Sequence, residues 1–168
     1  HENYLYAVEN GLKIFDYTDP ADPVFISYVD LENTDAADFN YPYLYYSNYA
    51  NSDDYYAGVV DVSDPENLVV YPEVLWFPTE IFCINGDGNY LYVGLYGEPH
   101  SMVRIYDVSS GFNAAVLFHE FLTTNGDPKK FAFVDEPTGP SRWLVVSSFS
   151  YYMEFLDITD MNSLEDTQ

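Results

Sequence analysis

Short runs of alternating apolar and polar residues recur along the chain, and two kinds of run repeat in a fixed order. The first is an aromatic-Leu-aromatic segment, found at 4–6, 43–45 and 90–92 and more loosely at 143–145. The second ends in an aspartate followed by a turn, at Asp16, Asp61, Asp107 and Asp157. Runs this short, rich in Tyr, Phe, Val and Ile, predict β-strands.

The aspartates are 45, 46 and 50 residues apart, a period typical of four-stranded propeller blades. An apolar run follows the first three aspartate turns, at 24–29, 68–71 and 115–121, and a shorter run precedes the later aromatic segments, at 36–39, 80–84 and 130–134. We predict an all-β fold of β-propeller-type repeats, with two complete four-stranded blades flanked by two partial ones. The units are 1–34 (three strands), 35–77, 78–122 and 123–168 (three strands). We expect them to belong to a larger propeller or to be completed by neighbouring copies.

Two residue types that could carry chemistry have a structural interpretation here. An aspartate at a strand end accepts hydrogen bonds from backbone amides two or three residues ahead, so the four repeated aspartates are predicted to shape turns. Cys83 lies within the apolar run 80–84, which predicts a buried, unreactive thiol.

Charge narrows the range of partners. The 168 residues include 5 Lys and Arg against 28 Asp and Glu, a net charge of −23. Such a surface repels nucleic acid and anionic lipid headgroups. The sequence contains no run of about 18 apolar residues, so it predicts no membrane span. The 18 Tyr and 12 Phe argue against a disordered acidic tail. The acidity itself fits cationic partners or solvation in high salt.

Two stretches carry a resemblance to a known family. Residues 90–94 followed by 103–109, and residues 61–67, resemble the LVIVD repeat of bacterial and archaeal extracellular and cell-surface proteins, including choice-of-anchor proteins. The third turn lacks the Asp-Pro pair, and the glycine at position 94 has no counterpart in the other units. The resemblance implies a propeller, export and a surface location.

Metal sites have one candidate. The acidic hairpin 51–54 offers Asp53 and Asp54 as oxygen ligands, which suit Ca²⁺, although a solvated hairpin fits the same residues. The three histidines, His1, His100 and His119, are far apart in different contexts and predict no transition-metal site.

Tyrosines near predicted hairpin tips are candidates for recognition. Tyr55 and Tyr56, and likewise Tyr151 and Tyr152, are placed to stack on a sugar or a partner protein. The serines at 147–150 lack a nucleophile elbow, and the acidic pair at 135–136 lies in a Pro-rich loop, so no catalytic residue is predicted.

Two functions remain in competition. The first is a non-enzymatic extracellular or cell-surface module for interaction or assembly, including a filament or matrix component, whose partners are other copies, surface proteins or carbohydrate. The alternative is a propeller hydrolase or lyase that acts on carbohydrate or another small molecule in the axial channel, with carboxylates from separate units.

Overall fold

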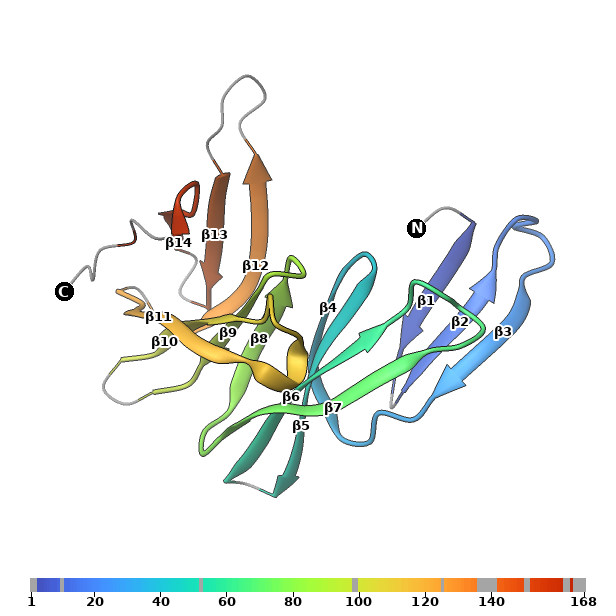
Figure 1. Ribbon diagram of the computed structural model, residues 1–168, viewed down its shortest axis with the longest axis horizontal. Coiled ribbons are helices and arrows are strands. Elements are labelled where there is room, and N and C mark those ends of the chain that lie inside the picture. The colour runs from blue at the N-terminus through green and yellow to red at the C-terminus, as the bar shows by residue number, and fades with distance from the viewer. Residues whose placement is uncertain are drawn as a thin grey trace.

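The computed structural model of the protein describes residues 3–9, 11–51, 53–97, 100–124, 126–135, 142–149, 152–161 and 164. Over these residues, fourteen strands form four antiparallel sheets in chain order, which confirms the all-β class (Figure 1). The helical structure of the same residues consists of one 3₁₀ turn, η1 (Phe112–Ala114). No helix in the described parts of the chain is long and apolar enough to cross a bilayer.

Each sheet contains three or four strands, and consecutive strands are neighbours. Sheet 1 consists of β1 (Tyr4–Val8), β2 (Leu12–Asp16) and β3 (Val24–Val29). Sheet 2 consists of β4 (Thr34–Asn40), β5 (Tyr43–Asn51), β6 (Asp54–Asp61) and β7 (Val69–Phe77). Sheet 3 consists of β8 (Ile81–Gly86), β9 (Tyr90–Leu95), β10 (Met102–Asp107) and β11 (Val116–Leu122). Sheet 4 consists of β12 (Pro128–Asp135), β13 (Arg142–Ser148) and β14 (Met153–Asp157).

The sheets follow one another along an arc. The first strands of sheets 2, 3 and 4 lie side by side, because β4 packs on β8 and β8 on β12. Later strands of each sheet lie successively further from this line, and sheets 1 and 4 form the two ends of the arc (Figure 1). The described residues do not close into a ring.

Strand β7 is longer than the sequence predicts. Its expected run ended at Tyr71 before Pro72, whereas the strand continues to Phe77, where it pairs with Tyr55 of β6. A proline is tolerated because β7 is an edge strand and the ladder shifts register between Ala57 and Val59.

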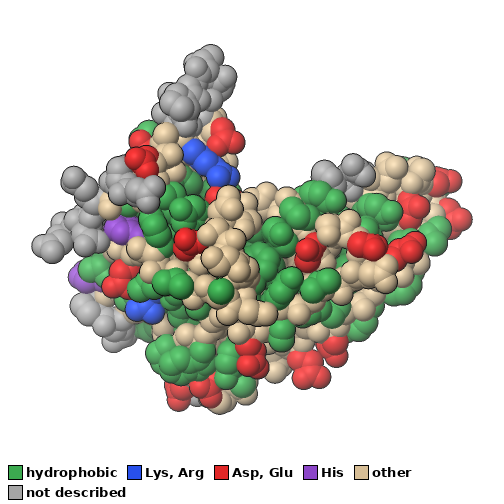
Figure 2. All heavy atoms as spheres, in the orientation of Figure 1, with side chains coloured by type: hydrophobic (Ala, Val, Ile, Leu, Met, Phe, Trp, Pro, Cys, Tyr) green, Lys and Arg blue, Asp and Glu red, His purple; other side chains and the backbone are tan. Residues whose placement is uncertain are grey.

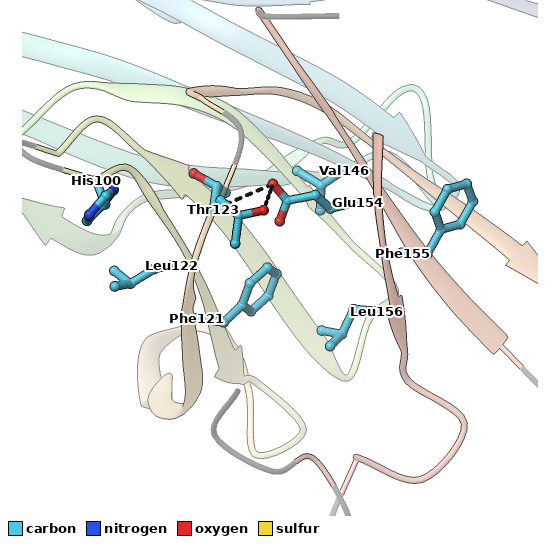
Figure 3. Close-up of a pocket in the computed structure, with 9 residues that line it drawn as sticks. His100, Phe121, Leu122, Thr123, Val146, Glu154, Phe155 and Leu156 are labelled. Carbon is cyan, nitrogen blue, oxygen red and sulfur yellow. Dashed lines mark hydrogen bonds between the residues drawn. The ribbon is translucent and has the colours of Figure 1, made fainter. Parts of the chain in front are cut away.

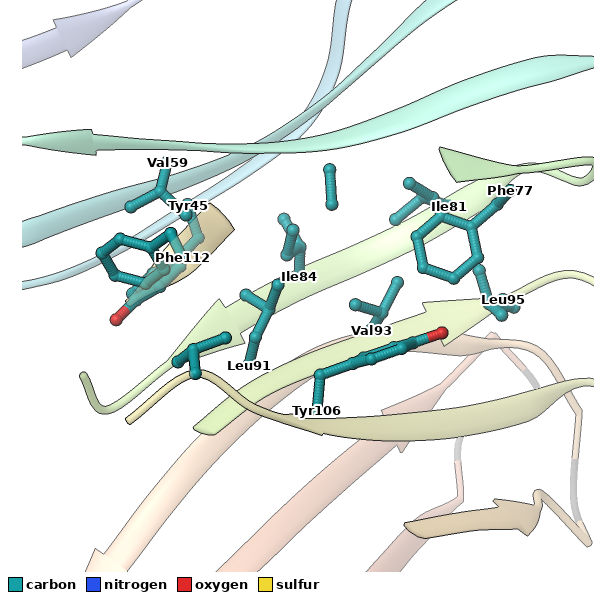
Figure 4. Packing of buried hydrophobic residues seen from close by; sticks show 12 residues of the cluster. Tyr45, Val59, Phe77, Ile81, Ile84, Leu91, Val93, Leu95, Tyr106 and Phe112 are labelled. Atoms are coloured by element: carbon teal, nitrogen blue, oxygen red, sulfur yellow. The ribbon is translucent and has the colours of Figure 1, made fainter. Parts of the chain in front are cut away.

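Three apolar clusters form the core, one between each pair of consecutive sheets. Figure 4 shows the cluster between sheets 2 and 3, in which Tyr45 and Val59 of sheet 2 face Leu91 of sheet 3. Phe112 of η1 covers one end of this cluster, with its ring centroid 5.0 Å from that of Tyr43. Sheets 2 and 3 therefore bury both faces, while sheets 1 and 4 bury one face each.

The repeated aspartates form the predicted turns. The backbone N–H groups of Thr18, Ser63, Ser109 and Thr159 donate to Oδ1 of the aspartate two residues earlier, at 2.8–2.9 Å. Hydrogen bonds from the Ser109 side chain and backbone lower the pKa of Asp107, and the residues following Asp16 and Asp157 act in the same way. Cys83 is buried as predicted, and this burial raises the pKa of its thiol.

Candidate functional site

A pair of side chains on each face of every sheet defines how neighbouring sheets meet. The pairs join the aromatic-Leu strand to the strand that ends in aspartate, and alternation along a strand places them on opposite faces. The pairs that contact the preceding sheet are Leu44 with Val60, Leu91 with Tyr106, and Leu144 with Leu156. The pairs that contact the following sheet are Tyr6 with Ile14, Tyr45 with Val59, and Tyr92 with Ile105.

The two end sheets carry the same pairs without a neighbour among the described residues. Leu5 pairs with Phe15 on the outer face of sheet 1, and Leu5 is 45% exposed although its equivalents, Leu44, Leu91 and Leu144, are at most 1% exposed. Phe155 pairs with Val145 on the outer face of sheet 4 and is 62% exposed, whereas its equivalents, Ile14, Val59 and Ile105, are fully buried.

The outer face of sheet 4, here the sheet 4 face, is apolar over most of its width. Its apolar residues come from all three strands: Ala132, Val134, Trp143, Val145, Met153 and Phe155. Four of them line a shallow groove of about 360 Å³: Val134, Trp143, Val145 and Phe155. Lys130 lies on the same face, next to Ser147.

The outer face of sheet 1, here the sheet 1 face, has a similar make-up. It presents Leu5, Ala7, Lys13, Phe15, Phe25 and Tyr28. The rings of Phe15 and Phe25 meet edge to face, with centroids 5.8 Å apart. The molecule therefore exposes an apolar face at each end of its arc.

A cleft of about 430 Å³ lies between β11 and sheet 4 (Figure 3). Phe121 and Leu156 point into it, and among the described residues that line it the carboxylate is that of Glu154. The backbone N–H and the hydroxyl of Thr124 both donate to Glu154 Oε1, at 2.9 and 3.2 Å.

The cleft adjoins the outer edge of β14, which pairs with no further strand in the described part of the chain. In sheet 2 a fourth strand, β7, occupies the corresponding position, and its Val70 pairs with Val60 and packs against sheet 1. Because Leu156 is the repeat equivalent of Val60, a strand added to β14 would place a side chain in this cleft.

Of the two predicted calcium ligands, the Asp54 carboxylate already has hydrogen-bond partners, and Asp53 is held through its backbone. Asp54 accepts bonds from the Asn51 side-chain amide and from Trp76 Nε1, the latter at 3.0 Å, while the Asp53 N–H donates to Asn51 Oδ1. No group of three or more His, Cys, Asp or Glu residues able to hold a metal occurs in the described residues. Calcium binding at this hairpin stays a prediction.

The predicted recognition tyrosines that the structure describes lie in sheet 2 and next to β14 of sheet 4. Tyr55 is half-buried against the core between sheets 2 and 3, and Tyr56 is half-buried opposite Trp76. Tyr152 is exposed, and Tyr151 lies outside the described residues. Their roles in recognition stay predictions. The sequence analysis did not single out Leu5 or Phe155, although each occupies a repeat position.

Known proteins resemble the chain in structure only. No family model matches it, and no curated protein matches its sequence. The computationally designed Ika4 protein aligns with a TM-score of 0.60 at 11% identity, covering 94% of this chain and 86% of that one. Hsv2 of Kluyveromyces lactis aligns with a TM-score of 0.55 at 15% identity, covering 94% of this chain and 47% of that one. A hypothetical selenium-binding protein from Sulfolobus tokodaii aligns with a TM-score of 0.54 at 16% identity, covering 88% of this chain and 46% of that one. The chain thus spans less than half of either natural protein.

Proposed function

We propose that the protein is a non-enzymatic interaction or assembly module built of propeller blades. One observation carries this proposal: the side-chain pairs that are buried at every junction between sheets recur uncovered at both ends of the arc, where Leu5 and Phe155 are exposed and their partners Phe15 and Val145 are half-buried. Large contiguous apolar faces on a protein surface mark sites that another protein covers. On this proposal the four sheets are a segment of a propeller that further protein completes.

The arrangement of the sheets supports the propeller part of the proposal. Blades are antiparallel sheets of four strands that pack face to face around a central line. Sheets 2 and 3 have four strands each, and the first strands of sheets 2 to 4 lie side by side. The resemblance of residues 103–109 to the LVIVD repeat supports a location outside the cell or on its surface, and it accords with the net charge of −23.

The cleft between sheets 3 and 4 has the make-up of a binding site. A glycosidase needs two carboxyl groups about 5–9.5 Å apart across the bond that is broken. The residues that line this cleft include one carboxylate, that of Glu154, and the rest of the lining is mainly apolar. The described lining of this cleft therefore does not itself supply the pair of carboxyl groups, and the alternative of a hydrolase or lyase acting in the axial channel stays a prediction.

Thiol labelling tests whether the sheet 4 face is covered. The single cysteine, Cys83, is buried, so Phe155→Cys adds one accessible thiol to an otherwise unreactive chain. In the protein's natural setting we expect this thiol to react at least about tenfold more slowly than an exposed control, Glu66→Cys, because a partner would shield it. Equal rates for the two thiols would overturn the proposed function.

A further inference from the structure

We infer that the partner on these faces is a second copy of this chain, docked head to tail with its sheet 1 face on the sheet 4 face of the first. The inference rests on the proposed function and specifies its partner. Each of the three internal junctions joins a face of the kind that contacts the following sheet to one that contacts the preceding sheet. The molecule exposes one face of each kind, so a second copy supplies the half that each end lacks.

The exposed pairs have the same chemical make-up as the buried ones. The pair on each face toward the following sheet combines one aromatic and one β-branched residue, as in Tyr45 with Val59. The pair Val145 and Phe155 has the same combination, but here the β-branched residue lies on the earlier strand, β13, and the aromatic residue on the later strand, β14. The pair on each face toward the preceding sheet contains a leucine and a second apolar residue, and Leu5 with Phe15 follows the same rule.

Charge disfavours the joining of two sheet 1 faces. Three of the five Lys and Arg residues lie in sheet 4, namely Lys129, Lys130 and Arg142. Asp19 and Asp22 are exposed in the turn of sheet 1 between β2 and β3. Figure 2 shows Lys and Arg side chains beside sheet 4 and Asp and Glu side chains at the far end of sheet 1. Of the three basic residues, Lys130 lies on the sheet 4 face, 3.9 Å from Asp38, while Arg142 is already paired with Asp87 at 2.8 Å and with Asp135 at 3.3 Å. Joining two sheet 1 faces would oppose the acidic groups of their turns, which the unlike contact avoids.

The sheet 1 face also carries a lysine that favours the same arrangement. Lys13 lies at its centre, paired across the strands with Tyr28. Asp157 lies on the sheet 4 face, paired with Trp143. Lys13 and Asp157 are thus charges of opposite sign on the two faces, and the like charge of Lys130 on the sheet 4 face is offset by Asp38, 3.9 Å away. A contact between two different faces leaves one of each kind free, so further copies add until a ring closes or a filament forms.

Two variants that each block one face test the inference. Leu5→Asp places a charge on the sheet 1 face, and Phe155→Asp places one on the sheet 4 face; both residues are exposed, so each variant is expected to keep its fold, checked by circular dichroism. In sedimentation experiments we expect the unmodified chain to form assemblies larger than the 19.3 kDa single chain. Each variant alone should sediment as a single chain, and their equimolar mixture should form a species of twice that mass that grows no further.

The matched control is Val116→Asp, which adds the same charge at an exposed apolar residue of sheet 3 outside both faces. It should assemble as the unmodified chain does. Dimers of either blocked variant alone, or a mixture that stays at single-chain mass, would overturn head-to-tail docking. A monomeric unmodified chain would also overturn it. If the Phe155→Cys thiol is nevertheless shielded in the natural setting, the proposed function stands with a different partner; if that thiol reacts freely, the proposed function fails as well.

Discussion

Glycine 58 makes room for one of the largest buried side chains. Tyr46 lies directly opposite Gly58 across β5 and β6, and an alanine methyl group at position 58 would overlap the Tyr46 ring. Tyr46 is itself fully enclosed in the core between sheets 1 and 2. The packing of the Tyr46 ring therefore requires that residue 58 has no side chain.

Gly58→Ala should lower the free energy of unfolding by about 1–3 kcal/mol, the usual cost of overpacking a core. Urea unfolding measures this loss. The same substitution in a Tyr46→Leu background should be less destabilising, because the ring that causes the overlap is gone. An equal loss in both backgrounds would show that the overlap is not the cause.

Buried tyrosines make the fold sensitive to alkali. Burial raises the pKa of Tyr46 to about 12, and it raises the pKa values of Tyr45 and Tyr92 as well. In the unfolded chain a tyrosine ionises near pH 10. Because the unfolded state then releases protons that the folded state retains, the contribution of these tyrosines to stability is constant below about pH 10 and falls as the pH rises above it.

Replacing Tyr46 with Phe should flatten this fall between about pH 10 and 12. One proton fewer is released on unfolding, which corresponds to about 1.4 kcal/mol per pH unit. Urea midpoints at a series of pH values from 8 to 12 provide the measurement, if the range is limited to conditions where unfolding is reversible. An unchanged slope would mean that Tyr46 ionises in the folded protein.

At the scale of strands and turns, the four repeated aspartates end strands β2, β6, β10 and β14 in the same way. Asp107 Oδ1 accepts bonds from the Ser109 N–H at 2.8 Å and from the Ser109 hydroxyl at 2.6 Å. Its lowered pKa means that the folded state favours the carboxylate. The stabilisation is therefore fully present above about pH 4, the ordinary Asp value, and is lost as the pH falls below it.

Asp107→Ala should lower the melting temperature at pH 7, and the difference from the unmodified chain should shrink as the pH falls below about 4. Asp107→Asn keeps an acceptor oxygen and should lose less. Calorimetry at several pH values compares the three proteins. A difference that stays constant with pH would assign the effect to packing and not to the carboxylate.

The strands could largely be predicted from the sequence because alternation and aromatic content are local signals. The end of β7 could not, because Pro72 argues for a break and only the position of β7 at a sheet edge makes the proline acceptable. Alternation also separates Leu5 from Tyr6 onto two faces. It does not say which face meets a neighbour, because that depends on how successive sheets pack, and the exposed faces were therefore not predicted.

At the scale of the whole molecule, a net charge of −23 acts on every proposed junction. Like charges on one chain and between copies repel, and salt shortens the range of this repulsion from about 10 Å at 0.1 M to about 3 Å at 1 M. The acidic surface thus opposes both compact folding and assembly at low salt.

Raising NaCl from 0.05 to 1 M should raise the unfolding midpoint and increase the assembled fraction of the unmodified chain, with the steepest change below about 0.3 M, where screening varies most. Thermal scans and sedimentation at each salt concentration provide the two readouts. Sucrose at matched osmolality is the control for preferential exclusion. An unfolding midpoint that is independent of salt would show that the acidity does not destabilise the isolated fold.

The two kinds of sheet face have a consequence for evolution. Since each junction joins one face of each kind, duplication or deletion of a whole repeat within the gene leaves every remaining junction of the same type. Arcs of different length would then arise without any newly evolved contact, and the number of units would be free to drift while the pairs typified by Leu91 and Tyr106 stay under selection.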